Sequence, residues 1–233
     1  MDQQGPDRRW IILAVFAVIA VGVVAGVLIS RGGGSNDSSS SSSSSSTEAS
    51  TGSCKEVETP HPKNASFEKP KQVLKAGEKA TVVMKTSCGT FKIALDTKRA
   101  PKTANSFAFL AEEGFYDDLT FHRIIPGFVV QGGDPEGTGT GGPGYNVVEK
   151  PPANLAYTKG VVAMAKSEAE PPGSSGSQFY VVTAPDAGLP PEYALVGKVS
   201  EGYSTVALIE KQGTPEGTPK QTVLIEEATV ERE

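Results

Sequence analysis

The sequence predicts a mainly β domain, either a β-barrel or a sandwich whose open ends are covered by helices, behind a transmembrane helix and a Ser-rich linker. The last two thirds of the 233-residue chain alternate short β-rich runs with glycine and proline, and only two stretches have helical spacing. Many short strands with few helices favour a barrel or a sandwich. The first third holds one long apolar run and one serine run, and neither suits a folded core.

The N-terminal apolar run predicts a membrane anchor. Trp10–Ile29 contains no charged residue, and twenty helical residues rise about 30 Å, the thickness of the hydrocarbon core of a bilayer. Arg8 and Arg9 precede the run and only Arg31 follows closely, so the positive-inside rule places residues 1–9 in the cytoplasm and the remainder of the chain outside. A cleavable signal peptide is the alternative, although the run is longer than usual and no A-x-A site ends it.

Residues 30–76 are expected to form a flexible linker and a domain lead-in, because a serine-rich stretch buries too little apolar surface to offset the entropy of ordering. The chain has two cysteines, Cys54 and Cys88. An exported location permits a disulfide between them, which would fasten the end of the linker to the domain and contribute about 3 to 4 kcal/mol by the loop-entropy model. Two separate thiols are the alternative.

Residues 77–233 are expected to form the folded domain, which opens with a hairpin and a helix. Ala80–Thr86 and Gly89–Asp96 are β-rich runs separated by a short Ser-Cys-Gly turn, a pattern typical of a hairpin. Pro101–Glu113 carries apolar residues at helical spacing, with proline near its start and glycine just past its end. This combination predicts a short amphipathic helix.

The remainder of the domain alternates short strands with glycine-rich connections. A second helix is predicted at Gly202–Gln212, with Val206 and Ile209 facing inward. Five further runs have strand character and follow in chain order: FHRIIPGFVVQ, KGVVAMA, SQFYVVTA, ALVGKVS and TVLIEEATV.

The composition argues against several classes of function. The net charge is -5 and the lysines are dispersed, so the basic footprint of a nucleic-acid-binding protein is missing. His61 and His122 are the only histidines, and neither has a partner at ligand spacing, so no metal site is expected. GTGTGG at Gly137–Gly142 satisfies G-x-G-x-x-G, but Pro143-Gly144 follows where a phosphate-binding loop needs a helix N-terminus. The folded part is expected to contain a single histidine, His122, so a catalytic serine triad has only one candidate for its base.

One charged residue stands inside an apolar stretch, because FHRIIPGFVVQGG places Arg123 among residues that favour burial. If Phe121–Gln131 is a strand, alternation puts Phe121 and Arg123 on one face until Pro126-Gly127 interrupts the register. A guanidinium is always charged, with five donors and no acceptor. The residues alone leave two interpretations open: Arg123 pairs with a surface carboxylate while Phe128 fills the core, or Arg123 is a functional cation.

Four blocks in this region resemble the signature of the cyclophilin family of peptidyl-prolyl isomerases. Their order and approximate spacing are those of the family: FHRIIPGFVVQGGD from Phe121, GTGTGG from Gly137, GVVAMA from Gly160 and GSQFYV from Gly176. The similarity spans roughly Ala80 to the C-terminus. It implies an eight-stranded antiparallel barrel capped by two α-helices, an active groove on the outer face, and catalysis of X-Pro isomerisation without a metal or another cofactor.

The resemblance also implies roles for individual residues. Arg123 matches the catalytic arginine of the family, Phe128 matches a contact of the proline ring, and Gln131 matches the glutamine that helps to hold the arginine and the substrate. The resemblance places seven further residues in contact with the substrate: Val129, Ala165, Lys166, Gln178, Tyr180, Leu189 and Tyr193.

The sequence departs from the family at the rim of this groove. Gly188 and Leu189 occupy the region where many eukaryotic members carry tryptophan, and Tyr193 stands where many carry histidine. Tyr180 replaces a common phenylalanine, and Lys166 replaces a frequent asparagine. These changes argue against tight binding of the cyclic peptide cyclosporin, whereas the isomerase core is kept.

Two functions of different classes follow from the resemblance and the layout. The first is an isomerase, resembling a membrane-anchored bacterial form, that acts on proline-containing segments of unfolded or flexible exported proteins. The second is a chaperone-like module that binds proline peptides with little turnover. Either protein is expected to be a monomer in the cell membrane, with a single span, a cytoplasmic N-terminus and an extracytoplasmic domain.

Overall fold

The computed structural model describes residues 52–233, so the expected membrane anchor and the serine run lie outside the described residues. Neither helix of the described part has the length and apolar character that a bilayer span requires. The elements follow in chain order as β1 (Ala80–Thr86), β2 (Gly89–Leu95), α2 (Pro101–Glu112), β3 (Leu119–Thr120), β4 (Arg123–Ile125), β5 (Val129–Gly132), β6 (Val147–Val148), β7 (Val161–Met164), β8 (Ser174–Ser175), β9 (Phe179–Val182), β10 (Leu195–Glu201), α3 (Tyr203–Glu210) and β11 (Leu224–Arg232).

Nine of these strands form one curved antiparallel sheet, in the order β3-β11-β1-β2-β10-β7-β9-β5-β4. Its two edge strands, β3 and β4, are consecutive in the chain and are separated only by Phe121 and His122. A bridge between Thr120 and Asp134 joins β3 to the segment that follows β5. The observed sheet is thus a mainly β half-barrel of nine strands with two helices, where the resemblance implied an eight-stranded barrel. Strands β6 and β8 pair with each other in a separate small sheet, which was not predicted.

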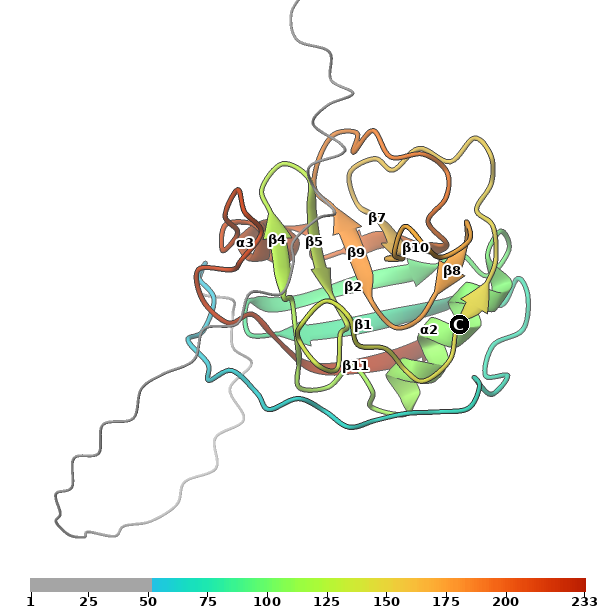
Figure 1. The fold of residues 1–233 in the computed structure, drawn as a ribbon, viewed down its shortest axis with the longest axis horizontal. Coiled ribbons are helices and arrows are strands. Elements are labelled where there is room, and N and C mark those ends of the chain that lie inside the picture. The colour runs from blue at the N-terminus through green and yellow to red at the C-terminus, as the bar shows by residue number, and fades with distance from the viewer. Residues whose placement is uncertain (1–51) are drawn as a thin grey trace, which may run out of the picture. The chain divides into compact units, whose positions relative to one another are not determined.

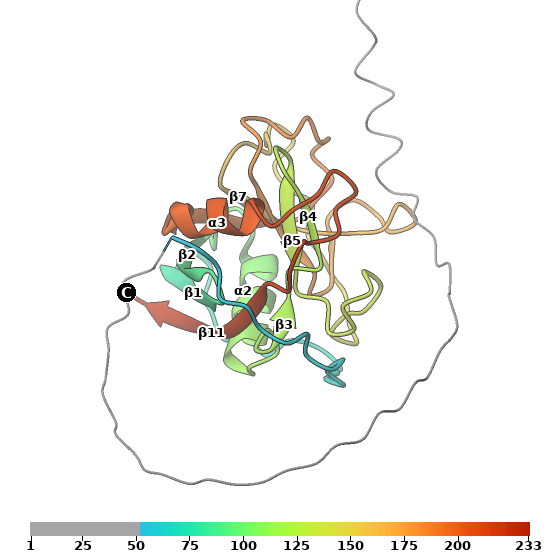
Figure 2. The ribbon, with the colours of Figure 1, turned by 90° about the vertical axis from the view of Figure 1, so that its left-hand side faces the viewer.

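The first hairpin and both helices lie where the sequence predicts them, within two residues at each end. Thr86 pairs with Gly89 across a two-residue turn, and Gly89 takes a φ of 116°, which only glycine adopts readily. Helix α3 buries Val206 and Ile209, as predicted. The helices lie at opposite ends of the sheet, with α3 beside β4 and β5 and α2 beside β11 (Figures 1 and 2).

The single strand predicted at Phe121–Gln131 is wrong, because the structure has a hairpin there. Strands β4 and β5 pair around a turn in which Phe128 N–H donates to the Ile125 carbonyl at 3.1 Å. Proline lacks an N–H for the ladder, and Gly127 has a φ of 72°, so these two residues fold the chain back. As a result Arg123 lies directly opposite Gln131.

Two apolar clusters cover the two faces of the sheet, because buried residues alternate strictly along its strands. In β9, Phe179 and Val181 join the larger cluster, which packs between the sheet and the helices, whereas Tyr180 and Val182 join the smaller one. Strands β5, β7 and β10 alternate in the same way. The smaller cluster, on the outer face, contains several of the residues implied as substrate contacts.

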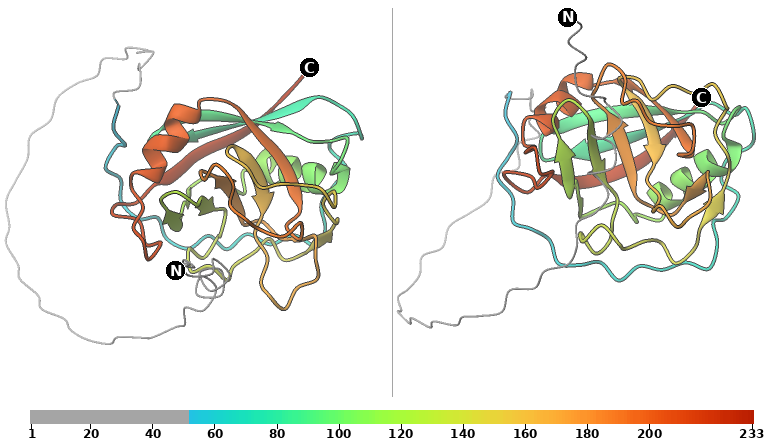
Figure 3. Two further views of the ribbon diagram at one scale, coloured as in Figure 1. Left: turned by 90° about the horizontal axis from the view of Figure 1, so that it is seen from above. Right: turned by 45° about the horizontal axis from the view of Figure 1, so that its top comes forward.

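Residues 54–78, called the strap below, lie along the outside of the domain from the β1–β2 turn to α2 (Figures 1 and 3). Cys54 and Cys88 are joined in a disulfide at one end of the strap. In the middle, Lys63 Nζ donates to the carbonyls of Gly114 at 2.6 Å and Asp117 at 3.0 Å.

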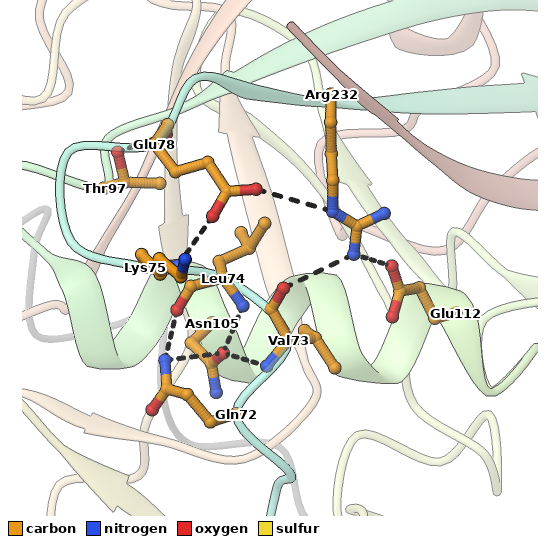
Figure 4. A network of polar contacts seen from close by, with 9 residues as sticks. All are labelled: Gln72, Val73, Leu74, Lys75, Glu78, Thr97, Asn105, Glu112 and Arg232. Carbon is orange, nitrogen blue, oxygen red and sulfur yellow. Dashed lines mark hydrogen bonds and ion pairs between the residues drawn. The ribbon is translucent and has the colours of Figure 1, made fainter.

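At the other end of the strap, Asn105 of α2 accepts hydrogen bonds from the backbone N–H groups of Val73 at 2.8 Å and Leu74 at 2.9 Å (Figure 4). Arg232 of β11 pairs with Glu112 and with Glu78, which lies 3.6 Å away, and so ties the strap to both elements. The described end of the expected linker is therefore bonded to the domain along its length.

Candidate active site

The hairpin and its neighbours place the implied catalytic residues in one row across the sheet. Arg123 lies opposite Gln131, Gln131 opposite Tyr180, and Tyr180 opposite Ala163. Directly opposite residues share a face of the sheet. The row therefore runs from β4 through β5 and β9 to β7 on the outer face.

A chain of side-chain amides fixes the guanidinium of Arg123. Its Nη1 donates to Gln131 Oε1 at 3.1 Å, and Gln131 Nε2 donates to Gln178 Oε1 at 3.1 Å. Gln178 Nε2 then donates to the Gly141 carbonyl at 3.0 Å. Each glutamine donates and accepts once in this chain, so the acceptor of Gln131 faces the arginine. The bond from Arg123 to Gln131 is the one that the resemblance implies for holding the arginine. The implied contacts of Gln131 and Gln178 with a substrate stay predictions.

The environment of Arg123 decides between the two interpretations that the sequence left open. Residues 52–233 contain three arginines. Arg99 and Arg232 form ion pairs, whereas Arg123 forms none with the described residues. Its Nη2 atom is buried without a hydrogen-bond partner. Burial lowers the pKa of this guanidinium, but arginine stays charged in proteins. The group is a fixed cation whose Nη2 nitrogen is free to donate, and the interpretation that Arg123 pairs with a surface carboxylate is wrong.

The smaller apolar cluster, where the resemblance places the proline slot, lies beside this cation on the outer face. Val129 and Tyr180 are buried in the smaller cluster, and the partly buried side chains of Phe128, Leu189 and Tyr193 pack against it. The rings of Tyr180 and Tyr193 stand edge to face with centroids 5.8 Å apart. Ala165 also packs against the cluster. The structure therefore gathers most of the implied substrate contacts in and around the smaller apolar cluster.

Tyr157 supports the slot, and the sequence reasoning missed it. Its hydroxyl donates to the Tyr193 carbonyl at 2.6 Å and accepts from the Tyr193 N–H at 3.0 Å. Burial raises the pKa of Tyr157 to about 12, so the hydroxyl keeps its proton. The segment that contains Tyr157 carries none of the signature blocks, so the sequence held no local signal for this contact.

Lys166 directs its ammonium group into the neighbouring loop, where Nζ lies 5.7 Å from the ring centroid of Tyr193. Its Nζ donates to the carbonyls of Ser167 and Glu170, both at 3.2 Å, and lies 3.8 Å from the Glu192 carboxylate. Its side chain is 6% exposed. The N–H of the preceding Ala165 donates to the Gln178 carbonyl at 2.8 Å. Contact between this strand edge and a peptide must therefore use the other main-chain groups, not the Ala165 N–H.

Tyr180 carries a buried hydroxyl that has no hydrogen-bond partner among the described residues. Burial raises its pKa well above the usual range, so the group is a neutral, unsatisfied donor. We expect Tyr180→Phe to raise the free energy of unfolding by about 1 kcal/mol, because an unsatisfied buried polar group is removed at nearly constant shape. Urea unfolding measures this change. Tyr157→Phe, which loses two bonded partners, is the matched control and should be destabilised; a loss of stability in Tyr180→Phe itself would contradict the prediction.

His122, next to Arg123, has both ring nitrogens buried without a described partner. Burial lowers its pKa most and Arg123 lowers it further, while the charge of Asp134 and the nearby backbone of Thr120 oppose both effects. The unfolded chain therefore binds more protons below about pH 6.5, and the folded state loses stability as the pH falls from 7 to 5. We expect urea midpoints of His122→Gln to fall less over this range than those of the wild type. Parallel slopes for the two proteins would refute this.

Metal ligation finds no support in the described part of the chain. Within residues 52–233, histidine, cysteine, aspartate and glutamate side chains do not gather in groups of three or more that could hold an ion. The fixed cation, the amide chain and the apolar cluster lie together at one place on the sheet.

Comparison with known proteins finds similarity to cyclophilin-type peptidyl-prolyl cis-trans isomerases. Residues 81–230 match the family model described as cyclophilin type peptidyl-prolyl cis-trans isomerase/CLD. The peptidyl-prolyl cis-trans isomerase-like 1 of Neurospora crassa is 39% identical over 157 residues, which cover 65% of this chain and 94% of that protein. The protein of the same name from Aspergillus oryzae is 39% identical over 159 residues, with coverages of 65% and 96%.

Solved structures agree with the sequence relatives. A cyclophilin type peptidyl-prolyl cis-trans isomerase of Cryptosporidium parvum superposes with a TM-score of 0.61 at 31% identity, covering 66% of this chain and 99% of that one. The same protein solved in the presence of the dipeptide Ala-Pro gives a TM-score of 0.61 at 30% identity.

Proposed function

The chain belongs to the cyclophilin-type family of peptidyl-prolyl cis-trans isomerases, and on that premise we propose that Arg123 stabilises the twisted imide of the substrate electrostatically. The observation that carries the proposal is the state of the guanidinium. Of the three nitrogens of the guanidinium, Nη1 is held by Gln131 and Nη2 is buried without a partner. A buried free donor on a fixed cation is suited to an acceptor that arrives with the substrate.

The chemistry of the X-Pro bond explains why a cation is enough. The barrier to rotation is about 18 to 20 kcal/mol, because the amide nitrogen shares its lone pair with the carbonyl in both planar isomers. In the twisted transition state that sharing is lost, and the nitrogen becomes a better hydrogen-bond acceptor. A donor fixed beside it stabilises the twisted form more than either isomer, which is the condition for catalysis. No proton is transferred in this step.

The apolar slot supplies the second requirement, which is orientation. We propose that Phe128, Tyr180 and Tyr193 hold the pyrrolidine ring while Arg123 faces the imide nitrogen. Preorganised donors in a site that excludes water act more strongly than donors in water. Gln131 and Gln178 keep the guanidinium from turning toward solvent, so the geometry is set before the substrate binds.

A module that binds proline peptides with little turnover remains the second candidate. It would use the same slot, and the cation would then serve only to bind a carbonyl. Exchange NMR on a short Ala-Pro peptide separates the two functions, because turnover broadens the cis and trans signals whereas binding alone shifts them. Signal shifts without exchange broadening would favour the binding module.

We also propose that the protein is a membrane-anchored, bacterial-type form that serves exported proteins. The support lies in the sequence: an uncharged run at Trp10–Ile29, arginines on its N-terminal side, and a serine-rich stretch after it. Proline-containing segments of flexible or unfolded exported chains are the expected clients. Labelling of introduced cysteines from outside intact cells tests the orientation, and labelling at residues 1–9 would contradict it.

A further inference from the structure

A second hollow, distinct from the slot, lies on the outer face at the end of β2. Its volume is about 330 Å³. Its walls come from the end of the strap, the β2–α2 turn, β7 and β10, and Leu155 adds to them from the loop before β7. The lining residues that matter chemically fall into two groups, an apolar floor of Leu95, Leu155, Val161 and Leu195, and a charged rim of Glu78, Lys79, Asp96, Lys98, Arg99 and Lys198.

The rim is positively charged although the whole chain carries a net charge of -5. Four cations stand against two carboxylates, and both carboxylates are already engaged. Asp96 binds Arg99 at 2.6 Å. Figure 4 shows Glu78 directed at Arg232 and at the backbone N–H of Lys75, to which its distance is 2.9 Å.

Two of the rim cations remain available to a ligand. Within residues 52–233, Lys98 and Lys198 form no ion pair, and both residues are exposed. The side chain of Lys198 lies over Gly160. A Cβ atom placed on Gly160 would be 3.5 Å from Lys198 Cε. Free ammonium groups above an apolar floor suit a ligand with a negative charge next to an apolar group.

The hollow and the catalytic slot both border the smaller apolar cluster. Leu155, Val161 and Leu195 line the hollow and pack in the same cluster as Tyr180. The row that begins at Arg123 reaches Leu195 of β10, which lies opposite Ala163. Four steps between neighbouring strands span about 19 Å, and an extended peptide covers that span with about six residues.

We propose that this hollow is a second binding site for the client chain, taking an acidic residue beside a large apolar one, about six to ten residues from the proline at Arg123. The inference rests on the proposed function, because the client must be a polypeptide whose proline occupies the slot. The volume is at the low end for ligand sites and holds one or two side chains. A client that engages both sites gains affinity through effective concentration without any new contact at the slot.

Two peptides and two charge-reversal variants test the proposal on the full chain in nanodiscs of neutral lipid. One peptide is a short Ala-Pro sequence; the other adds an eight-residue Gly-Ser linker and a Glu-Phe-Glu tail. We expect kcat/KM to be about tenfold higher for the tailed peptide at low salt. The gain should vanish in Lys98→Glu,Lys198→Glu and persist in the matched variant Lys69→Glu,Lys102→Glu. The short peptide should behave alike in all three proteins.

Each other outcome has a defined meaning. Equal kcat/KM for tailed and short peptides in the wild type overturns the second site but leaves the isomerase intact. Absence of turnover on both peptides overturns the proposed function alone, and binding of the Glu-Phe-Glu tail, followed by NMR shifts at Val161 and Leu195, still decides the site. If the charge reversal alters only attachment to nanodiscs that contain phosphatidylserine, the hollow is a lipid site and the proposal is wrong.

Discussion

Arg123→Ala is expected to lower kcat/KM for a short Ala-Pro peptide by about 10²- to 10³-fold, the effect of removing one preorganised donor from a transition state. The physical reason is that Nη2 is a buried, unpartnered donor on a cation held by Gln131. Binding should change much less, because the apolar slot stays intact. Exchange NMR measures turnover, and chemical-shift titration of the same sample measures the dissociation constant.

Two further variants separate catalysis from binding. Phe128→Ala should weaken peptide binding, because Phe128 packs at the edge of the slot. Arg123→Lys keeps the charge but loses the planar fork, so it should recover only part of the activity. Arg123→Ala with unchanged exchange, or with binding lost in proportion to turnover, would remove the electrostatic mechanism and leave the binding module as the better account.

Much of the fold follows from local sequence rules. The β1–β2 hairpin and both helices obey turn chemistry and apolar spacing, which act over a few residues. The hairpin at β4 and β5 shows the limit of such rules, because Pro126-Gly127 signals a break but not its direction. Arg123 lies opposite Gln131 because the chain folds back at this turn and β4 pairs with β5 in this register. Alternation along a single strand predicts which face of the sheet Arg123 and Gln131 share, but it does not predict that they lie opposite each other.

The candidate site likewise contains residues that the sequence predicts and residues that only the tertiary structure reveals. The family blocks contain Arg123, Phe128, Tyr180 and both glutamines, so short motifs predict this part of the site. Tyr157 and the conformation of Lys166 depend on partners from distant loops, such as Tyr193 and Glu192. The strap is a further case, because Asn105 fixes it through backbone groups that no side-chain pattern reveals. Such contacts require the tertiary structure.

Loss of the Cys54–Cys88 disulfide is expected to lower the free energy of unfolding by about 3 to 4 kcal/mol. The bond closes a loop whose ends are 34 residues apart, so its removal frees the unfolded chain more than the folded one. In the folded state the strap keeps its contacts with Gly114, Asp117 and Asn105. Urea unfolding of the wild type and of Cys54→Ser,Cys88→Ser, each with and without reductant, measures the difference.

The folded-state contacts of the strap explain why this loss should leave turnover nearly unchanged. The disulfide lies at the β1–β2 turn, whereas the slot lies on β4, β5 and β9. Reductant should destabilise the wild type and leave the double serine variant unaffected, which separates the bond from any other effect of the reagent. Asn105→Ala provides a matched lesion at the opposite end of the strap: it exposes backbone donors but keeps the cross-link. Equal midpoints for oxidised and reduced wild type would show that the strap's other contacts alone hold the segment in place and that the bridge contributes nothing.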